Sequence, residues 1–103
     1  MQQHKHTVIV SPAAKKKMLA HIRFLANASI LAAKRLRDSI YADFNLLAEN
    51  PNGYRRYDSK DCIENLHCKL CAKRYRIVFE VIDDTVYIYD IQDCRQDIDK
   101  NLV

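Results

Sequence analysis

The sequence lacks any hydrophobic run approaching the roughly 18 residues that a transmembrane helix needs, so we expect no membrane association. Its start, MQQHKHTVIV, lacks the apolar core of a secretory signal peptide, and a cytoplasmic protein is therefore predicted. Internal repeats, low-complexity tracts and signs of a second domain are also missing. The 103 residues are expected to form one domain, residues 1–103, near the lower size limit for a self-sufficient core.

A second closely spaced cysteine pair is missing as well. Cys68 and Cys71 form a C-x-x-C motif, whereas Cys62 and Cys94 lie apart in the sequence. Structural zinc sites normally use two such pairs, so we expect no metal and no other cofactor. Without a secretion signal, structural disulfides are not expected either. The cysteines are predicted to be reduced thiols that pack as small hydrophobic side chains, with Cys68 facing the core.

The charge balance is mildly basic. The chain has 17 lysines and arginines against 13 aspartates and glutamates, a formal net charge of +4. This balance favours an acidic partner or a polyanion.

Local signals predict a helical hairpin after a short first strand, Thr7–Val10. Ser11 is a good N-cap and Pro12 suits the first helical position, so a first helix should run from Pro12 to about Ala26. Ser29 is a suitable cap for a second helix over residues 30–49, which Asn50-Pro51-Asn52-Gly53 ends. Two long helices joined by a few residues form an antiparallel pair.

The C-terminal half predicts strands. Residues 54–61 show no clear period and are interpreted as a loop. Residues 62–70 alternate, with Leu66, Cys68 and Leu70 predicted to face the core and Asn65, His67 and Lys69 to face outward. After a turn near residues 71–73 comes the segment YRIVFEVIDDTVYIYDIQDCRQD, residues 75–97.

This segment is predicted to form a β-hairpin that turns at Asp83-Asp84. The turn places Val81 opposite Val86 and Phe79 opposite Ile88 on the core face. On the other face the same register places Tyr87 opposite Glu80. Continued without interruption, it places Tyr89 opposite Val78 and Ile91 opposite Arg76.

The predicted element order is β-α-α-β-β-β. This is an α+β fold with one antiparallel sheet, covered on one face by the helical hairpin and open on the other. The residues expected on the open face are His67, Lys69, Arg74, Arg76, Tyr87 and Tyr89, with Arg95 just beyond. Cations interspersed with tyrosines suit a phosphate backbone with stacked bases. The alternative is that these residues only keep an open sheet face soluble.

The stretch from Tyr75 to Arg95 resembles a motif near the C-terminus of the RelE/ParE toxin superfamily of bacterial toxin–antitoxin modules. The resemblance extends over about Thr7–Asp97. It implies a toxin of a type II module (a plasmid stabilisation protein) that inhibits growth and is neutralised by an acidic antitoxin. Its target would be DNA gyrase, as for ParE, or translated mRNA on the ribosome, as for RelE. The first strand would then lie beside the final strands.

The resemblance leaves the activity open. A RelE-like protein would be a metal-independent endoribonuclease, with Lys69 or His67 as base and Arg76 and Arg95 holding the phosphate. The segment Asp93–Asp97 offers neither tyrosine nor histidine, which leaves the general acid unassigned. A ParE-like protein would need no such set, and Ala32-Ala33 and Leu36 in the helical hairpin are similar to ParE. The remaining alternative is a non-catalytic basic module that binds an acidic protein or a nucleic acid.

Overall fold

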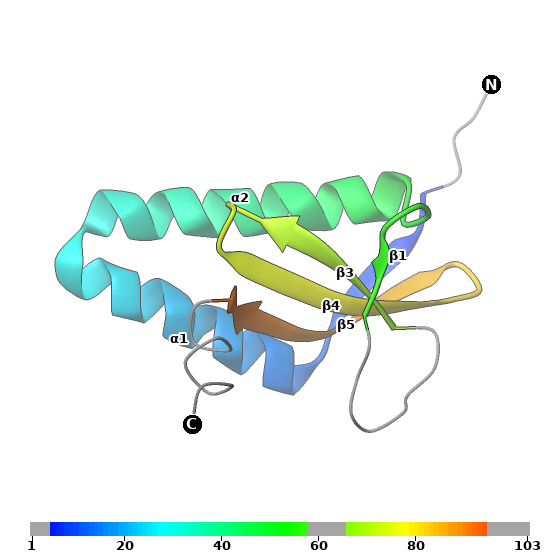
Figure 1. Ribbon diagram of the computed structural model, residues 1–103, viewed down its shortest axis with the longest axis horizontal. Coiled ribbons are helices and arrows are strands. Elements are labelled where there is room, and N and C mark those ends of the chain that lie inside the picture. Colours follow the sequence, from blue (N-terminus) through cyan, green and yellow to red (C-terminus); the bar gives the residue numbers. More distant parts are fainter. Residues whose placement is uncertain (1–4, 58–65, 95–103) are drawn as a thin grey trace.

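The computed structural model describes residues 5–57 and 66–94. Two helices lie side by side along one face of a sheet (Figure 1). The elements in chain order are β1 (Thr7–Val10), α1 (Pro12–Ala28), α2 (Ile30–Glu49), β2 (Arg55–Arg56), β3 (Leu66–Cys71), β4 (Tyr75–Ile82) and β5 (Thr85–Asp93). The predicted α+β fold and the order of its main elements are confirmed.

The sheet has the strand order β1-β5-β4-β3-β2. Its last four strands pair antiparallel, while β1 pairs parallel with β5, so the sheet is mixed. The first strand thus lies beside the last one, as predicted. The loop predicted over residues 54–61 is wrong at Arg55–Arg56, which form the edge strand β2 and pair with Cys68 and His67 of β3.

Two serines set the limits of the helices. The Ser11 hydroxyl accepts a hydrogen bond from the Ala14 amide at 3.0 Å, with proline following at the first helical position. Ser29 acts at both helices: its amide donates to the Leu25 carbonyl, and its hydroxyl accepts from the Ala32 amide at 3.1 Å. One residue therefore ends α1 and begins α2, and α1 runs to Ala28 rather than Ala26.

The core lies between the helical hairpin and one face of the sheet. Its fully buried side chains include Ile40 and Leu47 from α2 and Phe79, Val86 and Ile88 from β4 and β5. Ala14 and Met18 of α1 also belong to it. This apolar contact holds the helices against the sheet. It stabilises the folded state by roughly 25 cal/mol for each Å² of apolar surface buried.

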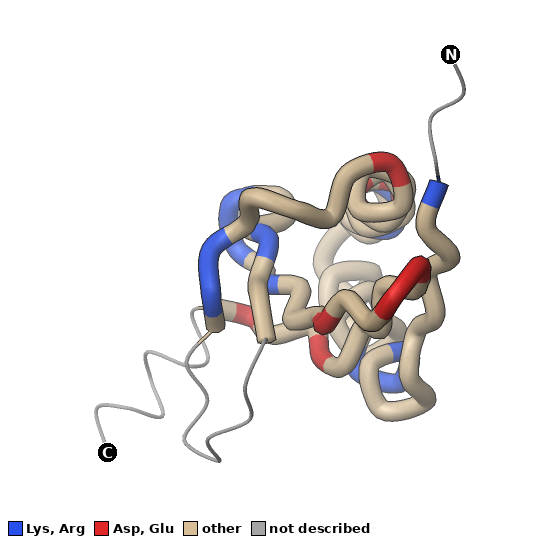
Figure 2. The backbone as a smooth tube through the Cα atoms, turned by 90° about the vertical axis from the view of Figure 1, so that its right-hand side faces the viewer, with Lys and Arg blue, Asp and Glu red and all other residues tan. Residues whose placement is uncertain are grey.

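The β4–β5 hairpin turns as predicted. Ile82 pairs with Thr85 across Asp83-Asp84, whose acidic residues are drawn red in Figure 2, and Asp83 has a left-handed φ of 54°. The predicted pairs Val81–Val86, Phe79–Ile88 and Glu80–Tyr87 are confirmed.

Beyond Phe79 the predicted register is wrong. A bulge leaves Tyr89 as an extra residue, so that Val78 pairs with Asp90, Ile77 with Ile91 and Arg76 with Gln92. The cause is the spacing of apolar residues in β5. An uninterrupted ladder would turn Asp90 into the core, whereas the bulge turns in Ile91, which is 0% exposed.

The predicted faces of β3 are also wrong. Cys71 is buried in the core, so alternation places Lys69 and His67 on the helix-covered face with it. Cys68 and Leu70 lie on the open face, where Leu70 is 58% exposed. The polar Lys69 tolerates the covered face because Asp43 of α2 pairs with it there.

Candidate functional site

The open face of the sheet contains a hollow of about 520 Å³. The residues that line it are Arg55, Arg56, Tyr57, Cys68, Leu70, Arg76 and Cys94. Three arginines thus line the hollow, and none of its described lining residues is a carboxylate. Arginine groups around a concave surface favour a negatively charged group of a partner.

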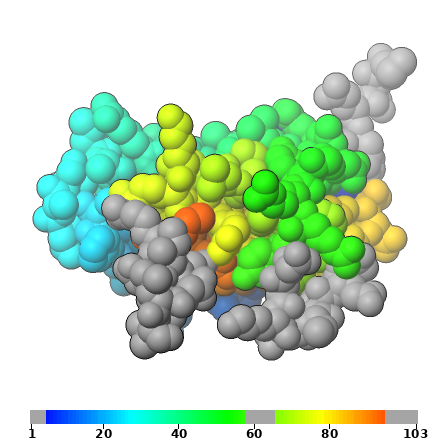
Figure 3. All heavy atoms as spheres, in the orientation of Figure 1, coloured from blue at the N-terminus to red at the C-terminus, as the bar shows by residue number. Residues whose placement is uncertain are grey.

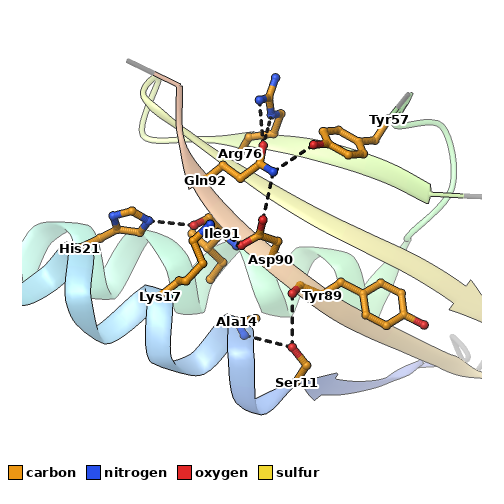
Figure 4. Close-up of polar contacts among 10 residues, drawn as sticks. All are labelled: Ser11, Ala14, Lys17, His21, Tyr57, Arg76, Tyr89, Asp90, Ile91 and Gln92. Carbon is orange, nitrogen blue, oxygen red and sulfur yellow. Dashed lines mark hydrogen bonds and ion pairs between the residues drawn. The ribbon is translucent and has the colours of Figure 1, made fainter. Parts of the chain in front are cut away.

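Arg76 is held in a fixed orientation within this hollow. Its Nε and Nη2 donate hydrogen bonds of 3.0 and 2.8 Å to the amide oxygen of Gln92, the residue opposite it on β5. Its guanidinium carbon lies 5.4 Å from the centre of the Tyr57 ring. Figure 4 shows Gln92 between these two side chains. A planar guanidinium held from two sides loses little side-chain entropy when it binds a partner.

The hydrogen bonds continue from Gln92 to α1. The Gln92 amide nitrogen donates to the Tyr57 hydroxyl and to Asp90 Oδ2, both at 3.0 Å. Asp90 Oδ1 in turn pairs with Lys17 Nζ at 2.8 Å. Burial raises the pKa of Asp90, but hydrogen bonds from Lys17 and Gln92 outweigh it and hold the pKa below its ordinary value of 3.8.

Lys17→Met should destabilise the protein at neutral pH by an amount that disappears in acid. The depressed pKa of folded Asp90 means that its contribution is present above the unfolded value near 3.8 and is lost as pH falls through the folded value. We expect the free energy of unfolding of the variant to be lower than that of the wild type by up to about 1 kcal/mol at pH 7. Urea unfolding of both proteins between pH 7 and pH 2.5 measures it; Lys16→Met is the control. A constant difference across this range would contradict the assignment.

The half of β5 that extends past β1 is held by side chains of the α1 segment. The Ser11 hydroxyl donates to the Tyr89 carbonyl at 3.3 Å, and His21 Nε2 lies 2.8 Å from the Ile91 carbonyl. Asp90 Oδ1 also accepts the Ile91 amide at 2.9 Å. These contacts fix the backbone that carries Gln92 and, through it, Arg76 (Figure 4).

Tyr87 and Tyr89 lie on the open face, as predicted. Their rings are stacked, with centroids 6.5 Å apart. The Tyr89 hydroxyl donates to Glu80 at 2.8 Å, and this hydrogen bond raises the pKa of Tyr89. The pair forms an aromatic surface on β5, on the same face of the sheet as the hollow.

Lys69 and His67 lie across the sheet from the hollow. Lys69 Nζ is 3.0 Å from Asp43 Oδ1, with side chains only 16% and 14% exposed, and it lies 5.8 Å from the centre of the Tyr54 ring. The His67 ring lies 6.0 Å from that of Phe79 in the core. The predicted grouping of these two candidate bases with Arg76 is therefore wrong, because their side chains point to opposite faces.

A scan of protein-family models matches the ParE toxin of the type II toxin–antitoxin system parDE over residues 8–98. The chain belongs to the ParE toxin family. It is thus the toxin component of a type II toxin–antitoxin system, which confirms the predicted superfamily. No curated protein matches.

A solved structure of the chromosomal ParDE system from P. aeruginosa has the same fold, with a TM-score of 0.71 at 15% identity. The match covers 87% of this chain and 97% of that one. Among the described residues of this ParE family member, no helix is long and apolar enough to cross a membrane.

Of the other two predicted cations, the structure describes Arg74, which does not join Arg76. Arg74 lies over the Tyr75 ring at 5.6 Å, and its Nη2 is 4.0 Å from Asp93 Oδ2. It lines a separate hollow against α2, so its predicted place beside Arg76 on the open face is wrong. Arg95 lies outside the described residues.

Among the residues that line the hollow in this ParE family member, sequence reasoning placed only Arg76 on the open face. Arg55, Arg56 and Tyr57 fall in the segment interpreted as a loop, and Gln92 was not considered. Two adjacent arginines followed by a tyrosine were a usable signal, but nothing in the sequence shows that β2 pairs with β3.

The C-x-x-C motif spans both faces of β3. Cys68 lines the open hollow, whereas Cys71 is buried in the core, contrary to the prediction that Cys68 faces it. Burial, followed by a hydrogen bond with Asp43, raises the pKa of Cys71 to about 12. Burial also raises the pKa of Cys68. In a strand, positions i and i+3 point to opposite faces, so these two thiols do not converge on one metal ion.

Proposed function

We propose that this ParE family member arrests bacterial growth by binding DNA gyrase through the open sheet face around Arg76, without cleaving RNA. The observation that carries the proposal is the position of Lys69 and His67 on the covered face. A general base must lie within hydrogen-bond reach of the 2′-hydroxyl while arginines hold the adjacent phosphate. With the sheet between them, Lys69 and Arg76 do not meet this requirement.

A second candidate is cleavage of translated mRNA. It is favoured by the three arginines beside Tyr57 in the hollow, since guanidinium groups bind phosphate bidentately. In this reading the base is a group other than Lys69 or His67. A non-catalytic basic module that only binds an acidic protein or a nucleic acid is the third reading, and it predicts no growth arrest.

The partner that neutralises the toxin is, in our proposal, an acidic antitoxin, in accord with the net charge of +4. Both candidate targets are cytoplasmic, and the cytoplasm is therefore the proposed site of action.

Induction of the chain alone in a bacterial host separates the targets. We expect growth arrest with loss of plasmid supercoiling and DNA damage, while bulk mRNA decays at its normal rate. In vitro, the purified protein should inhibit supercoiling by gyrase and leave mRNA intact in a translation extract. The control is Arg76→Ala, which should neither arrest growth nor inhibit supercoiling by gyrase. Rapid cleavage of translated mRNA with unaffected gyrase would refute the gyrase target, and unaltered growth at high yield would refute an active toxin.

A further inference from the structure

Two thiols lie beside the arginines of the open hollow, and the proposed function uses neither of them. Cys68 of β3 and Cys94, directly after β5, both line the hollow, and both side chains are partly exposed. Cys71, by contrast, is 0% exposed. In Figure 3 the strands that surround the hollow are seen on the face toward the viewer, with β2 in green, β3 and β4 in yellow shades and the end of β5 in orange. A reagent in solution therefore reaches Cys68 and Cys94 but not Cys71.

Cys68 is flanked by arginines of both neighbouring strands. Arg55 is its direct partner on β2, and the side chains of such a pair point to the same face, with Cβ atoms about 5 Å apart. Arg76 of β4 lines the same hollow. Burial raises the pKa of Cys68, while the positive charges of Arg76 and Arg55 act to lower it, which places both guanidinium groups near the sulfur. The Arg55 side chain has no hydrogen bond or ion pair to another described residue.

The two thiols of the hollow do not form a disulfide with each other. Cys68 pairs with Val78, whereas the Cys94 amide donates to the carbonyl of Arg74, four residues before Val78. Four residues of extended chain span about 13 Å. The Cα atoms of a disulfide lie within about 7 Å of each other, so Cys94 does not supply the second sulfur of a disulfide to Cys68.

We propose that Cys68 is a site of reversible modification by small disulfides that carry carboxylates, such as oxidised glutathione. Arg55 and Arg76 bind the carboxylates and hold the disulfide against the thiol. The hollow of about 520 Å³ lies within the range of small-molecule sites, roughly 300–1,000 Å³. None of its described lining residues is a carboxylate that would repel such a reagent.

The reaction is thiol–disulfide exchange. Cys68 loses its proton, its sulfur attacks one sulfur of the reagent, and the S–S bond of the reagent breaks as the new bond forms. The leaving half takes up a proton, so that a thiol and a disulfide give a mixed disulfide and a thiol. The arginines stabilise the negative charge that the transition state spreads over the sulfurs. Because burial keeps Cys68 largely protonated, attack on an uncharged disulfide is slow, and the preference for an anionic one comes from the arginines.

The modification fills the hollow. Its carboxylates lie against Arg55 and Arg76, so these arginines no longer bind an anionic group of a partner. This consequence for toxicity rests on the proposed function, whereas the modification itself does not. A reducing agent such as dithiothreitol restores the thiol, and we expect it to restore the inhibition of gyrase as well.

The test compares two reagents of nearly the same size, dithiodiglycolate and its uncharged diamide. The protein is the Cys62→Ser/Cys94→Ser variant, in which Cys68 is the only cysteine besides the buried Cys71. We expect the dianion to react about tenfold faster at low salt, the lower end of the effect that charges have in a cleft. The preference should disappear at about 1 M salt, where the screening length is about 3 Å. Intact-protein mass spectrometry measures both rates.

The same preference should disappear when Arg55→Gln is added to this variant. The matched control is Arg23→Gln, which removes an exposed arginine of α1 and should leave the preference unchanged. Melting temperatures establish that both variants fold. Equal rates of the two reagents, or a preference that survives Arg55→Gln, would overturn the proposal.

Treatment of the wild-type protein with oxidised glutathione, followed by peptide mass spectrometry, identifies the modified residue. Modification at Cys68 supports the proposal, and modification at Cys62 or Cys94 in its place would overturn it. Gyrase inhibition is measured separately. Inhibition by the protein modified at Cys68 would contradict the consequence for toxicity, whereas a reduced wild-type protein that does not inhibit gyrase contradicts only the proposed function.

Discussion

Arg76→Ala should abolish growth arrest while the protein stays folded. The guanidinium lies on the open face and is half-buried, so its loss opens no cavity in the core. What is lost is one of the cations that line the hollow, with its two hydrogen bonds to Gln92. We expect destabilisation of about 1 kcal/mol and a shift in melting temperature of a few degrees. Plating efficiency under induction measures toxicity, and thermal unfolding measures stability.

Arg76→Lys tests whether charge alone is sufficient. Lysine keeps the charge but not the planar, doubly hydrogen-bonded group, so we expect toxicity to remain strongly reduced. Lys16→Ala removes an exposed cation from α1 and should leave toxicity unchanged. Full toxicity of the Arg76→Ala variant would show that the hollow is not the functional site. Arg95→Ala in the same assay tests the second arginine predicted from the sequence.

The second large effect is on stability. Lys69→Ala should destabilise the protein by about 3 kcal/mol, the lower end for a buried pair that loses one partner, because both side chains are 14–16% exposed. Asp43 is then left without its cation beneath α2. For a chain of this size the melting temperature should fall by at least about 10 °C. The variant would lose toxicity because it unfolds. In a growth assay alone, this result would look the same as the removal of a catalytic lysine.

The double variant Asp43→Leu/Lys69→Met separates the two explanations. Removing both charges leaves no unpaired ion, so most of the stability should return. We expect its toxicity to return as well, because Lys69 has no part in gyrase binding in our proposal. A double variant that is as stable as the wild type but non-toxic would contradict this and restore Lys69 as a functional residue.

The features that the sequence predicted are those with local causes. Ser11-Pro12 and Ser29 determine where the helices begin through contacts within three residues, and Asp83-Asp84 determines the first pairs of the hairpin. The bulge at Tyr89 had a visible signal as well. Val86, Ile88 and Ile91 change spacing from two to three, and only an extra residue keeps all three in the core.

The features that the sequence could not predict depend on partners far along the chain. Lys69 was assigned to the open face because a lysine in an alternating strand normally faces water. Its actual face is decided by Asp43, on a helix 26 positions earlier, and by Cys71 at the end of the same strand. The prediction of the residues around Arg76 was incomplete for the same reason, since Arg55 and Arg56 reach the hollow only because β2 pairs with β3.

The contacts of Ser11 and His21 with β5 also bear on self-association. The carbonyls of Tyr89 and Ile91 lie past the end of β1, where an uncovered strand edge would be a template for pairing with a second copy of the chain. The Tyr89 carbonyl already accepts a hydrogen bond from Ser11, the Ile91 carbonyl lies 2.8 Å from His21 Nε2, and the Ile91 amide donates to Asp90. The edge that the short first strand leaves open is therefore protected against edge-to-edge polymerisation, even when the toxin accumulates without its antitoxin.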